Sequence, residues 1–248
     1  MRYKLDLSYD GTNYHGWQVQ KNTSNTVQHI VQENLSLILK ENIEIIGCGR
    51  TDTGVSASHY IAHFDCKAVI EDIENVIYKL NQMFPDDVVI HDMQLVHPDF
   101  HARFDALSRS YRYRLTCTKQ AFDRHYTYYY RFQKELDLTL LNHCANALIG
   151  KHDFTNFTKV GSDNKTNYCT ITKSEWIVKD EIYTFTIQGD RFLRGMIRLL
   201  VGAMLNVNRG SLSGDEFISA LINPNQKVQK WSVPPEGLLL TDIQYPVN

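Results

Sequence analysis

Apolar and polar residues alternate over the first nine positions of the chain. The odd positions 3–9 are tyrosine or leucine and the even positions between them are polar, a period of two that predicts a β-strand. An apolar stripe with helical spacing comes next, behind Asn25 as N-cap and with Gln28 at the capping-box position. Similar patterns continue through the first 107 residues. They predict strands over 2–9, 43–48, 60–64 and 88–96, and helices over 25–39 and 69–80, the second ending before Pro85.

The order β-α-β-β-α-β is that of a split βαβ, or ferredoxin-like, unit. A comparable series follows, with strands over 109–116, 170–178, 182–187 and 238–245 and helices over 138–148, 193–207 and 215–222. We therefore predict an α+β protein of two ferredoxin-like, RRM-like domains, whose mixed, mainly antiparallel sheets form a central cleft. The predicted domains are 1–107, which carries Asp52, and 108–248, which carries a tyrosine-containing strand and an arginine-rich helix.

Composition narrows the class of protein. The 248 residues are 43% hydrophobic and 22% charged, values typical of a soluble globular protein. No apolar run is long enough to span a bilayer, and the first residues lack the apolar segment of a signal peptide, so we expect a cytoplasmic protein without membrane contact. The five cysteines are scattered without a C-x-x-C pair, which predicts neither a zinc site nor a disulfide framework.

The net charge of −2 conceals a local asymmetry. Residues 65–99 carry eight acidic residues and two lysines, whereas residues 101–131 carry seven basic residues and two aspartates. Residues 191–209 carry four arginines and no acidic residue. Local basic stretches matter more than the total for phosphate recognition, although a solvated protein surface explains such runs equally well.

The stretch 49–57, GRTDTGVSA, lies between two predicted strands and carries Arg50 and Asp52 on a glycine-flanked connection. A carboxylate beside a guanidinium stays ionised and can act as a nucleophile or base. The alternative is an Asx-type turn, in which Asp52 and the threonines cap their own backbone.

Tyrosines and arginines alternate on the predicted strand 109–114. Tyr111 and Tyr113 share one face and Arg112 and Arg114 the other, because side chains alternate along a strand. Such interleaving suits nucleic acid, in which rings stack on bases and guanidinium groups meet phosphates. Packing of both tyrosines on a sheet face is the alternative.

Three arginines follow one another at helical spacing in the stretch 189–198. Arg191, Arg194 and Arg198 are three and four residues apart, so a helix through them would place all three on one stripe. An amphipathic helix with solvated arginines is the alternative explanation.

Five motifs in order resemble the tRNA pseudouridine synthase A family. The catalytic signature of that family resembles residues 49–55, GRTDTGV. The other four motifs are residues 9–12 with 16–18, residues 100–106 with 109–113, residues 192–198, and residues 234–240.

The resemblance implies an isomerase that converts uridine to pseudouridine in the tRNA anticodon stem-loop, at tRNA positions 38, 39 and 40. It implies a homodimer of two-domain subunits that uses no metal and no organic cofactor. It makes Asp52 the catalytic aspartate, Tyr111 the tyrosine that stacks on the target base, and Arg198 the basic partner of the aspartate. Arg50 would help to open the stem, and we expect Arg109, Arg191 and Arg194 to bind the substrate.

Two other functions fit the residues alone. A non-catalytic RNA-binding module on the same sheets would explain the tyrosine–arginine strand without using Asp52. A carboxylate-based hydrolase acting on a nucleoside would use Asp52 and release free base. For the isomerase, the target base must leave its stack before it can be turned, which predicts a flipping pocket that contains Tyr111.

Overall fold

The computed structural model describes residues 1–159, 165–224, 226 and 228–246. The chain divides into two compact units, Met1–Leu107 with Leu240–Asn248, and Ser108–Leu239. We predicted that the second domain would run to residue 248. Among the described residues, 240–246 group instead with the first unit, in which Leu107 N donates to Gln244 O and His59 lies 3.2 Å from Asp242.

The first unit is built on an antiparallel sheet in which β1 (Arg2–Tyr9) is central. It lies between β4 (Val88–Val96) and β3 (Ser56–Asp65). Both β2 (Ile45–Gly47) and β10 (Leu238–Gln244) pair with β3. The odd residues of β1 are buried and the even ones are partly exposed, so the alternation in the sequence matches one covered and one open face.

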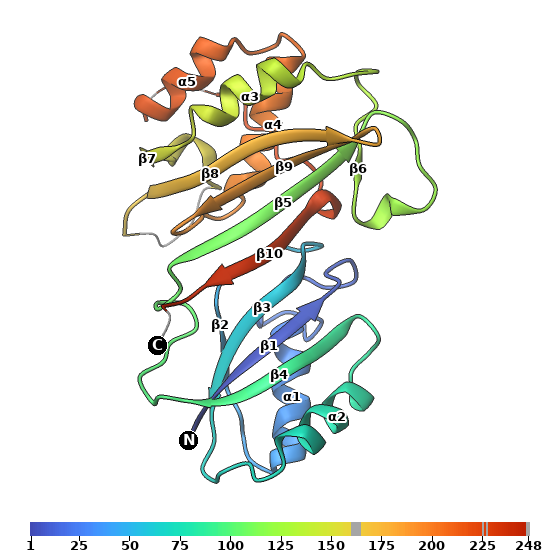
Figure 1. The fold of residues 1–248 in the computed structure, drawn as a ribbon, viewed down its shortest axis with the longest axis vertical. Coiled ribbons are helices and arrows are strands. Elements are labelled where there is room, and N and C mark those ends of the chain that lie inside the picture. Colours follow the sequence, from blue (N-terminus) through green and yellow to red (C-terminus); the bar gives the residue numbers. More distant parts are fainter. Residues whose placement is uncertain (160–164, 225, 227, 247–248) are drawn as a thin grey trace. The chain divides into compact units, whose positions relative to one another are not determined.

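Two helices cover the apolar face of this sheet, α1 (Val27–Leu39) and α2 (Ile73–Met83) (Figure 1). The predicted cap of α1 was wrong. Thr26 accepts the bond from His29 N, and Asn25 donates its side-chain N–H to Asn13 O instead. Helix α2 begins only after Asp72, whose side chain caps it.

The second unit contains an antiparallel sheet in the order β5 (Ser108–Thr116), β9 (Ile182–Gly189), β8 (Tyr168–Lys179) and β7 (Gly150–Asp153). A short strand, β6 (Tyr128–Tyr129), pairs in parallel with β5. The two-residue turn between β8 and β9 places Asp180 and Glu181 at φ 51° and 61°, the left-handed conformation that tight hairpins need.

Helices α3 (Leu138–Asn146), α4 (Met196–Asn208) and α5 (Gly214–Ile222) pack in the second unit (Figure 1). Single-turn 3₁₀ helices occupy Asp123–His125, Thr155–Phe157 and Pro235–Gly237. Eleven of the thirteen residues of α4 are buried, which makes it the central helix of this core. The α+β class and the mainly antiparallel pairing are as predicted.

The start of α4 was predicted wrongly. The helix begins at Met196, after Gly195 at φ 69°, a left-handed conformation that ends the preceding turn. Arg191 and Arg194 therefore lie in the connection before the helix and only Arg198 lies on it. The three arginines do not form a helical stripe.

Candidate active site

Asp52 lies on a tight turn in the first unit. Val55 N donates to Asp52 O at 3.1 Å, and Gly54 adopts φ 76°. Thr51, the residue before it, is buried, and its hydroxyl hydrogen-bonds the Tyr9 hydroxyl at 2.9 Å. The loop is thus a main-chain turn, in which the Thr51 hydroxyl bonds Tyr9 rather than its own backbone, as the Asx-type interpretation had expected. This turn presents the half-buried Asp52.

The segment after β1 fixes the main chain of this loop. Trp17 N donates to Thr51 O at 3.3 Å, and Gly54 N donates to Tyr14 O at 3.2 Å. Gly16 sits at φ 90°, where a Cβ would lie 2.5 Å from Thr51 O. Glycine is therefore required at position 16 both by conformation and by close approach. The sequence offered no local signal for this contact.

An aromatic cluster supports the start of the loop. Trp17 stacks on Tyr60 with ring centroids 4.0 Å apart, and Tyr9 lies edge-on to Tyr60 at 5.5 Å. The Tyr60 hydroxyl donates to Gly49 O. Because all three rings are buried, the loop rests on a part of the core with little freedom to move.

Arg50 is exposed on the same loop. Its Nε donates to Gln18 Oε1 at 3.2 Å, and Gln18 in turn donates to Gln28 Oε1 at 2.7 Å. The recorded hydrogen-bond partner of the guanidinium is therefore a neutral amide, which leaves its positive charge available to a phosphate or a base edge.

In the second unit, Tyr111 lies on β5 and is 9% exposed. Its ring meets that of Phe192 edge-on, with centroids 5.2 Å apart. Arg109 lies two residues earlier, on the same face of the strand, and donates to Asp190 O at 2.8 Å. The stretch 190–192 thus crosses the strand face that carries Arg109 and Tyr111.

For Tyr113, the packing interpretation is confirmed. This side chain is fully buried and its hydroxyl donates to Pro234 O at 2.9 Å. Burial raises its pKa well above the usual value. On the opposite face, Arg114 pairs with Asp123 at 3.5 Å and burial lowers the pKa of Arg112.

The arginine-bearing connection 189–198 is fixed by hydrogen bonds that each involve a main-chain group. Asp190 Oδ1 accepts from Thr170 N at 2.8 Å and from Arg191 N at 2.7 Å. Arg194 O accepts from Lys159 N at 3.1 Å. On the helix, Arg198 Nε donates to Val233 O at 2.6 Å, so the three arginines occupy three separate environments.

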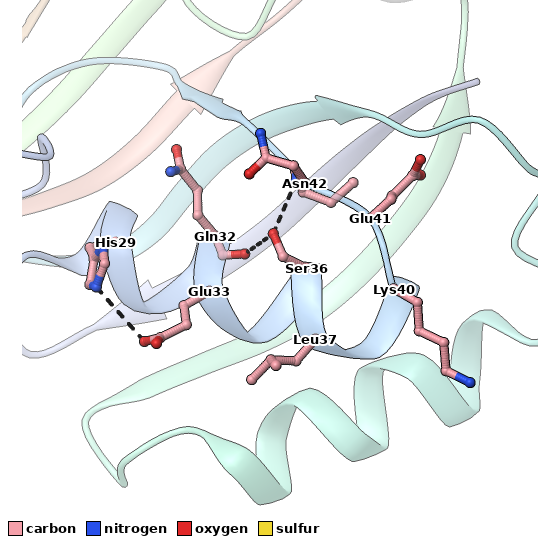
Figure 2. Close-up of a pocket in the computed structure, with 9 residues that line it drawn as sticks. His29, Gln32, Glu33, Ser36, Leu37, Lys40, Glu41 and Asn42 are labelled. Atoms are coloured by element: carbon pink, nitrogen blue, oxygen red, sulfur yellow. Dashed lines mark hydrogen bonds and ion pairs between the residues drawn. The ribbon is translucent and has the colours of Figure 1, made fainter.

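A hollow of about 560 Å³ lies on the outer side of α1, where His29, Glu33, Ser36 and Lys40 are among its lining residues (Figure 2). Ser36 Oγ donates to Gln32 O at 2.7 Å and accepts from Ile43 N at 3.0 Å. These bonds fix the segment that follows the C-terminal end of α1. Because none of the lining residues comes from the Asp52 loop, we assign this hollow no part in the active site.

The described residues contain neither a metal-binding cluster nor a membrane-spanning helix. No group of three or more His, Cys, Asp or Glu side chains among them is arranged to hold a metal ion. Within the same residues, no helix is long and apolar enough to cross a membrane.

Comparison with known proteins identifies the family. The family described as tRNA pseudouridine synthase matches residues 7–105 and 144–246. The chain belongs to the tRNA pseudouridine synthase family. Members of this family are isomerases, and the activity of the chain is accordingly that of a tRNA pseudouridine synthase.

Relatives of this family match the chain over nearly its full length. The tRNA pseudouridine synthase A of Bacteroides fragilis is 43% identical over 99% of this chain and 96% of its own. That of Bacteroides thetaiotaomicron is 42% identical over 99% and 91%, and that of Acetivibrio thermocellus 38% identical over 98% and 98%. Both units of the synthase are therefore common to these relatives.

Proposed function

We propose that this synthase converts uridine to pseudouridine in the tRNA anticodon stem-loop, with Asp52 as its catalytic aspartate. The observation that carries the proposal is the construction of the Asp52 loop. Its main chain is held by Tyr14 and Trp17 and rests on a buried aromatic cluster. A carboxylate presented by so constrained a loop is preorganised for reaction.

The reaction breaks the N1–C1′ bond of uridine, turns the uracil and forms a C5–C1′ bond. The proton on C5 is released and N1 gains one, so the net change is an isomerisation. The Asp52 carboxylate acts at the sugar in this proposal, either by attacking C1′ or by removing a sugar proton. Both routes need the carboxylate to be ionised.

The remaining site residues hold the substrate. Tyr111 stacks on the target uracil after it leaves the helix, and Phe192 supports the tyrosine ring from its edge. Arg198 supplies positive charge for the aspartate, and Arg50 assists opening of the stem. Arg109, Arg191 and Arg194 contact the RNA backbone, whose phosphates favour guanidinium groups.

The substrate and assembly follow from the same resemblance. We propose uridines at tRNA positions 38, 39 and 40 as targets, a homodimer as the working form, and the cytoplasm as the location. The targets are tested by mapping pseudouridine in tRNA from cells with and without the gene. The homodimer is tested by measuring the molar mass of the protein with light scattering as it elutes from a size-exclusion column.

The central experiment replaces Asp52 by asparagine. Uridine tritiated at C5 releases its label when C5 joins C1′, so tritium release from labelled tRNA reports the reaction directly. We expect Asp52→Asn to abolish release while tRNA binding, measured by filter retention, stays within about twofold, because the amide keeps the shape of the side chain.

The matched control is Asp86→Asn, which removes one negative charge from an exposed position of the same unit. This variant should release tritium at the normal rate. Normal turnover by Asp52→Asn would rule out the catalytic assignment. Release of free uracil by the native protein would instead indicate a nucleoside hydrolase.

A further inference from the structure

A second hollow, of about 440 Å³, lies within the second unit. Its lining includes Tyr128 of β6, Phe132, Arg209 at the end of α4, and the segment Lys230, Trp231 and Ser232. We call these six residues the Trp231 pocket. None of them is among the residues to which the proposed reaction gives a role.

An aromatic corner forms one part of the Trp231 pocket. The rings of Phe132 and Trp231 lie 6.3 Å apart and at 88° to each other. The fully buried Tyr130 lies 5.4 Å from Phe132 and 6.2 Å from Trp231. Phe132 is nevertheless 53% exposed, so a planar group could cover its ring and bury apolar area.

Three cationic side chains lie at this corner. The guanidinium carbon of Arg209 lies 5.9 Å from the ring centroids of both Phe132 and Trp231, and that of Arg131 lies 5.9 Å from Phe132. The hydrogen-bond partners of Arg209 are Asn206 and Ser211, and Lys230 Nζ donates to Thr158 O at 2.9 Å.

The partners of these cations are thus neutral. Across the residues that the structure describes, no carboxylate lies within ion-pair distance of Arg131, Arg209 or Lys230. Burial and, after it, the nearby Glu236 carboxylate raise the pKa of Tyr128 in this pocket, but Glu236 forms no ion pair with the three cations. The cations therefore remain available to an anionic ligand. A cavity that combines such cations with an exposed aromatic corner suits a ligand that is both aromatic and anionic.

The wall that carries Trp231 is held in place by α4. A Cβ at Gly202 would lie 1.9 Å from Trp231 O, so the helix and this segment are in close main-chain contact. Two residues later, Val233 N donates to Arg198 O at 3.2 Å. Between them, Ser232 Oγ is buried and has no hydrogen-bond partner among the described residues.

We propose that the Trp231 pocket binds one unpaired nucleotide, with its base against Phe132 and Trp231 and its phosphate at Arg209 and Lys230. The volume of the pocket falls within the range of small-ligand pockets. An acidic peptide would satisfy the cations without using the aromatic corner. The nucleotide is one of the tRNA substrate other than the target uridine, an attribution that rests on the proposed function. A free nucleotide offers the same chemistry.

Tryptophan fluorescence provides a local reporter. The chain has three tryptophans, of which Trp17 and Trp176 are 1% and 2% exposed. A base that stacks in the pocket therefore quenches Trp231 selectively. The probes are a single-stranded adenosine pentanucleotide and AMP, each titrated into the full-length protein. We expect saturable quenching, which Trp231→Phe removes.

Arg209→Gln should weaken binding of the probe about tenfold, since it loses a phosphate contact and a cation over the rings. Arg209→Lys, which keeps the charge, should weaken it less. Phe132→Leu alters a half-exposed side chain and should also weaken binding. The matched control is Lys179→Gln, which removes an exposed cation at the end of β8 and should bind as the parent does.

Tighter binding of the pentanucleotide than of AMP would support an RNA strand as the source, and equal binding would support a free nucleotide. Absence of quenching by both probes, or equal binding by Arg209→Gln and the parent, would overturn the proposal. Asp52→Asn should be quenched as the parent is. The quenching experiment can therefore contradict nucleotide binding in the Trp231 pocket without contradicting the catalytic assignment of Asp52, and tritium release tests that assignment separately.

Discussion

Arg198 and Val233 hold each other through two hydrogen bonds. Arg198 Nε donates to Val233 O at 2.6 Å, and Val233 N donates to Arg198 O at 3.2 Å. The side chain proposed as the basic partner of Asp52 therefore also ties the segment 231–234 to α4. An Arg198 variant can therefore lose activity because Asp52 loses its basic partner or because the segment 231–234 is no longer tied to α4. The two effects must be measured separately.

Arg198→Lys keeps the positive charge but loses the Nε donor. We expect the free energy of unfolding to fall by about 1.5–3 kcal/mol, the range for a hydrogen bond from a charged group. Arg194→Lys is the matched control, because Arg194 is exposed and its recorded bonds use its carbonyl. Urea unfolding measures both, and equal stability of the two variants would contradict a structural role for Arg198.

Gly16→Ala tests how the Asp52 loop is fixed. The substitution places a Cβ 2.5 Å from Thr51 O at φ 90°, so we expect a loss of stability greater than the ~1–2 kcal/mol of a left-handed residue alone. Displacement of the loop should also lower the rate of tritium release by about 10- to 100-fold.

Two other glycines serve as controls for Gly16. Gly210 has φ 77° and open space around it, so Gly210→Ala should show the conformational cost without the clash. Gly49 is in the motif, yet a Cβ there meets nothing within 4 Å, and Gly49→Ala should change stability by less than about 0.5 kcal/mol. Equal effects at positions 16 and 210 would show that the contact with Thr51 is unimportant.

The sequence predicted those elements whose pattern is local. Strand β1 was predicted correctly because one face of its sheet is buried, which imposes alternation on its residues. Strand β4 was predicted with the bounds that the structure has. The start of α4 was predicted too early because Leu193 fits the apolar spacing of the helix. The left-handed conformation of Gly195 prevents the helix from extending back to Leu193.

Contacts between segments distant in the sequence could not be predicted. Nothing near Gly16 indicates that Thr51 O approaches it, and nothing near Trp231 indicates its contact with Gly202. The cap of α1 was ambiguous because Asn25 and Thr26 are both good N-caps, and a contact of Asn25 with Asn13 decides between them. Strands β6 and β7 are too short to show a period.

Substitutions of Tyr111 separate the ring from its hydroxyl. Tyr111→Phe keeps the ring and should retain partial activity. Tyr111→Ala removes a stacking surface worth about 1–3 kcal/mol per base, so kcat/KM for tRNA should fall by about 5- to 150-fold. Phe192→Leu leaves Tyr111 in place but removes its edge contact at 5.2 Å, and we expect an intermediate loss. Equal activity of the Phe and Ala variants would exclude stacking as the function of this residue.

His63 makes the first unit sensitive to acid. It is 2% exposed, and its Nδ1 accepts from Ala102 N at 3.1 Å. Burial, with the positive charges of Arg2 and His101, lowers its pKa to about 4 from 6.5. Between these values the unfolded chain binds a proton that the folded chain does not. Stability contributed by neutral His63 is thus complete above pH 6.5 and is lost as the pH falls toward 4.

The measurement is the free energy of unfolding of His63→Gln relative to the parent, from urea titrations between pH 4 and 8. We expect the parent to lose up to ~1.4 kcal/mol per pH unit more than the variant within that window, the limit for one proton. Taking the difference removes the contribution of the carboxylates that both proteins share. A constant difference across the window would contradict the burial of a neutral His63.

His59 should show the opposite dependence in the same experiment. A hydrogen bond to Asp6, opposed in part by burial and aided by Asp242, raises the pKa of His59. Its Nε2 lies 3.4 Å from Asp6 and its Nδ1 lies 3.2 Å from Asp242. The stability contributed by charged His59 is complete below pH 6.5 and is lost as the pH rises through the folded-state pKa. The His59→Gln variant should therefore lose less stability than the parent as the pH rises above 6.5. The His63→Gln variant should lose less stability than the parent as the pH falls below 6.5. If both variants changed the profile on the same side, the two histidines could not hold the opposite charge states that their surroundings favour.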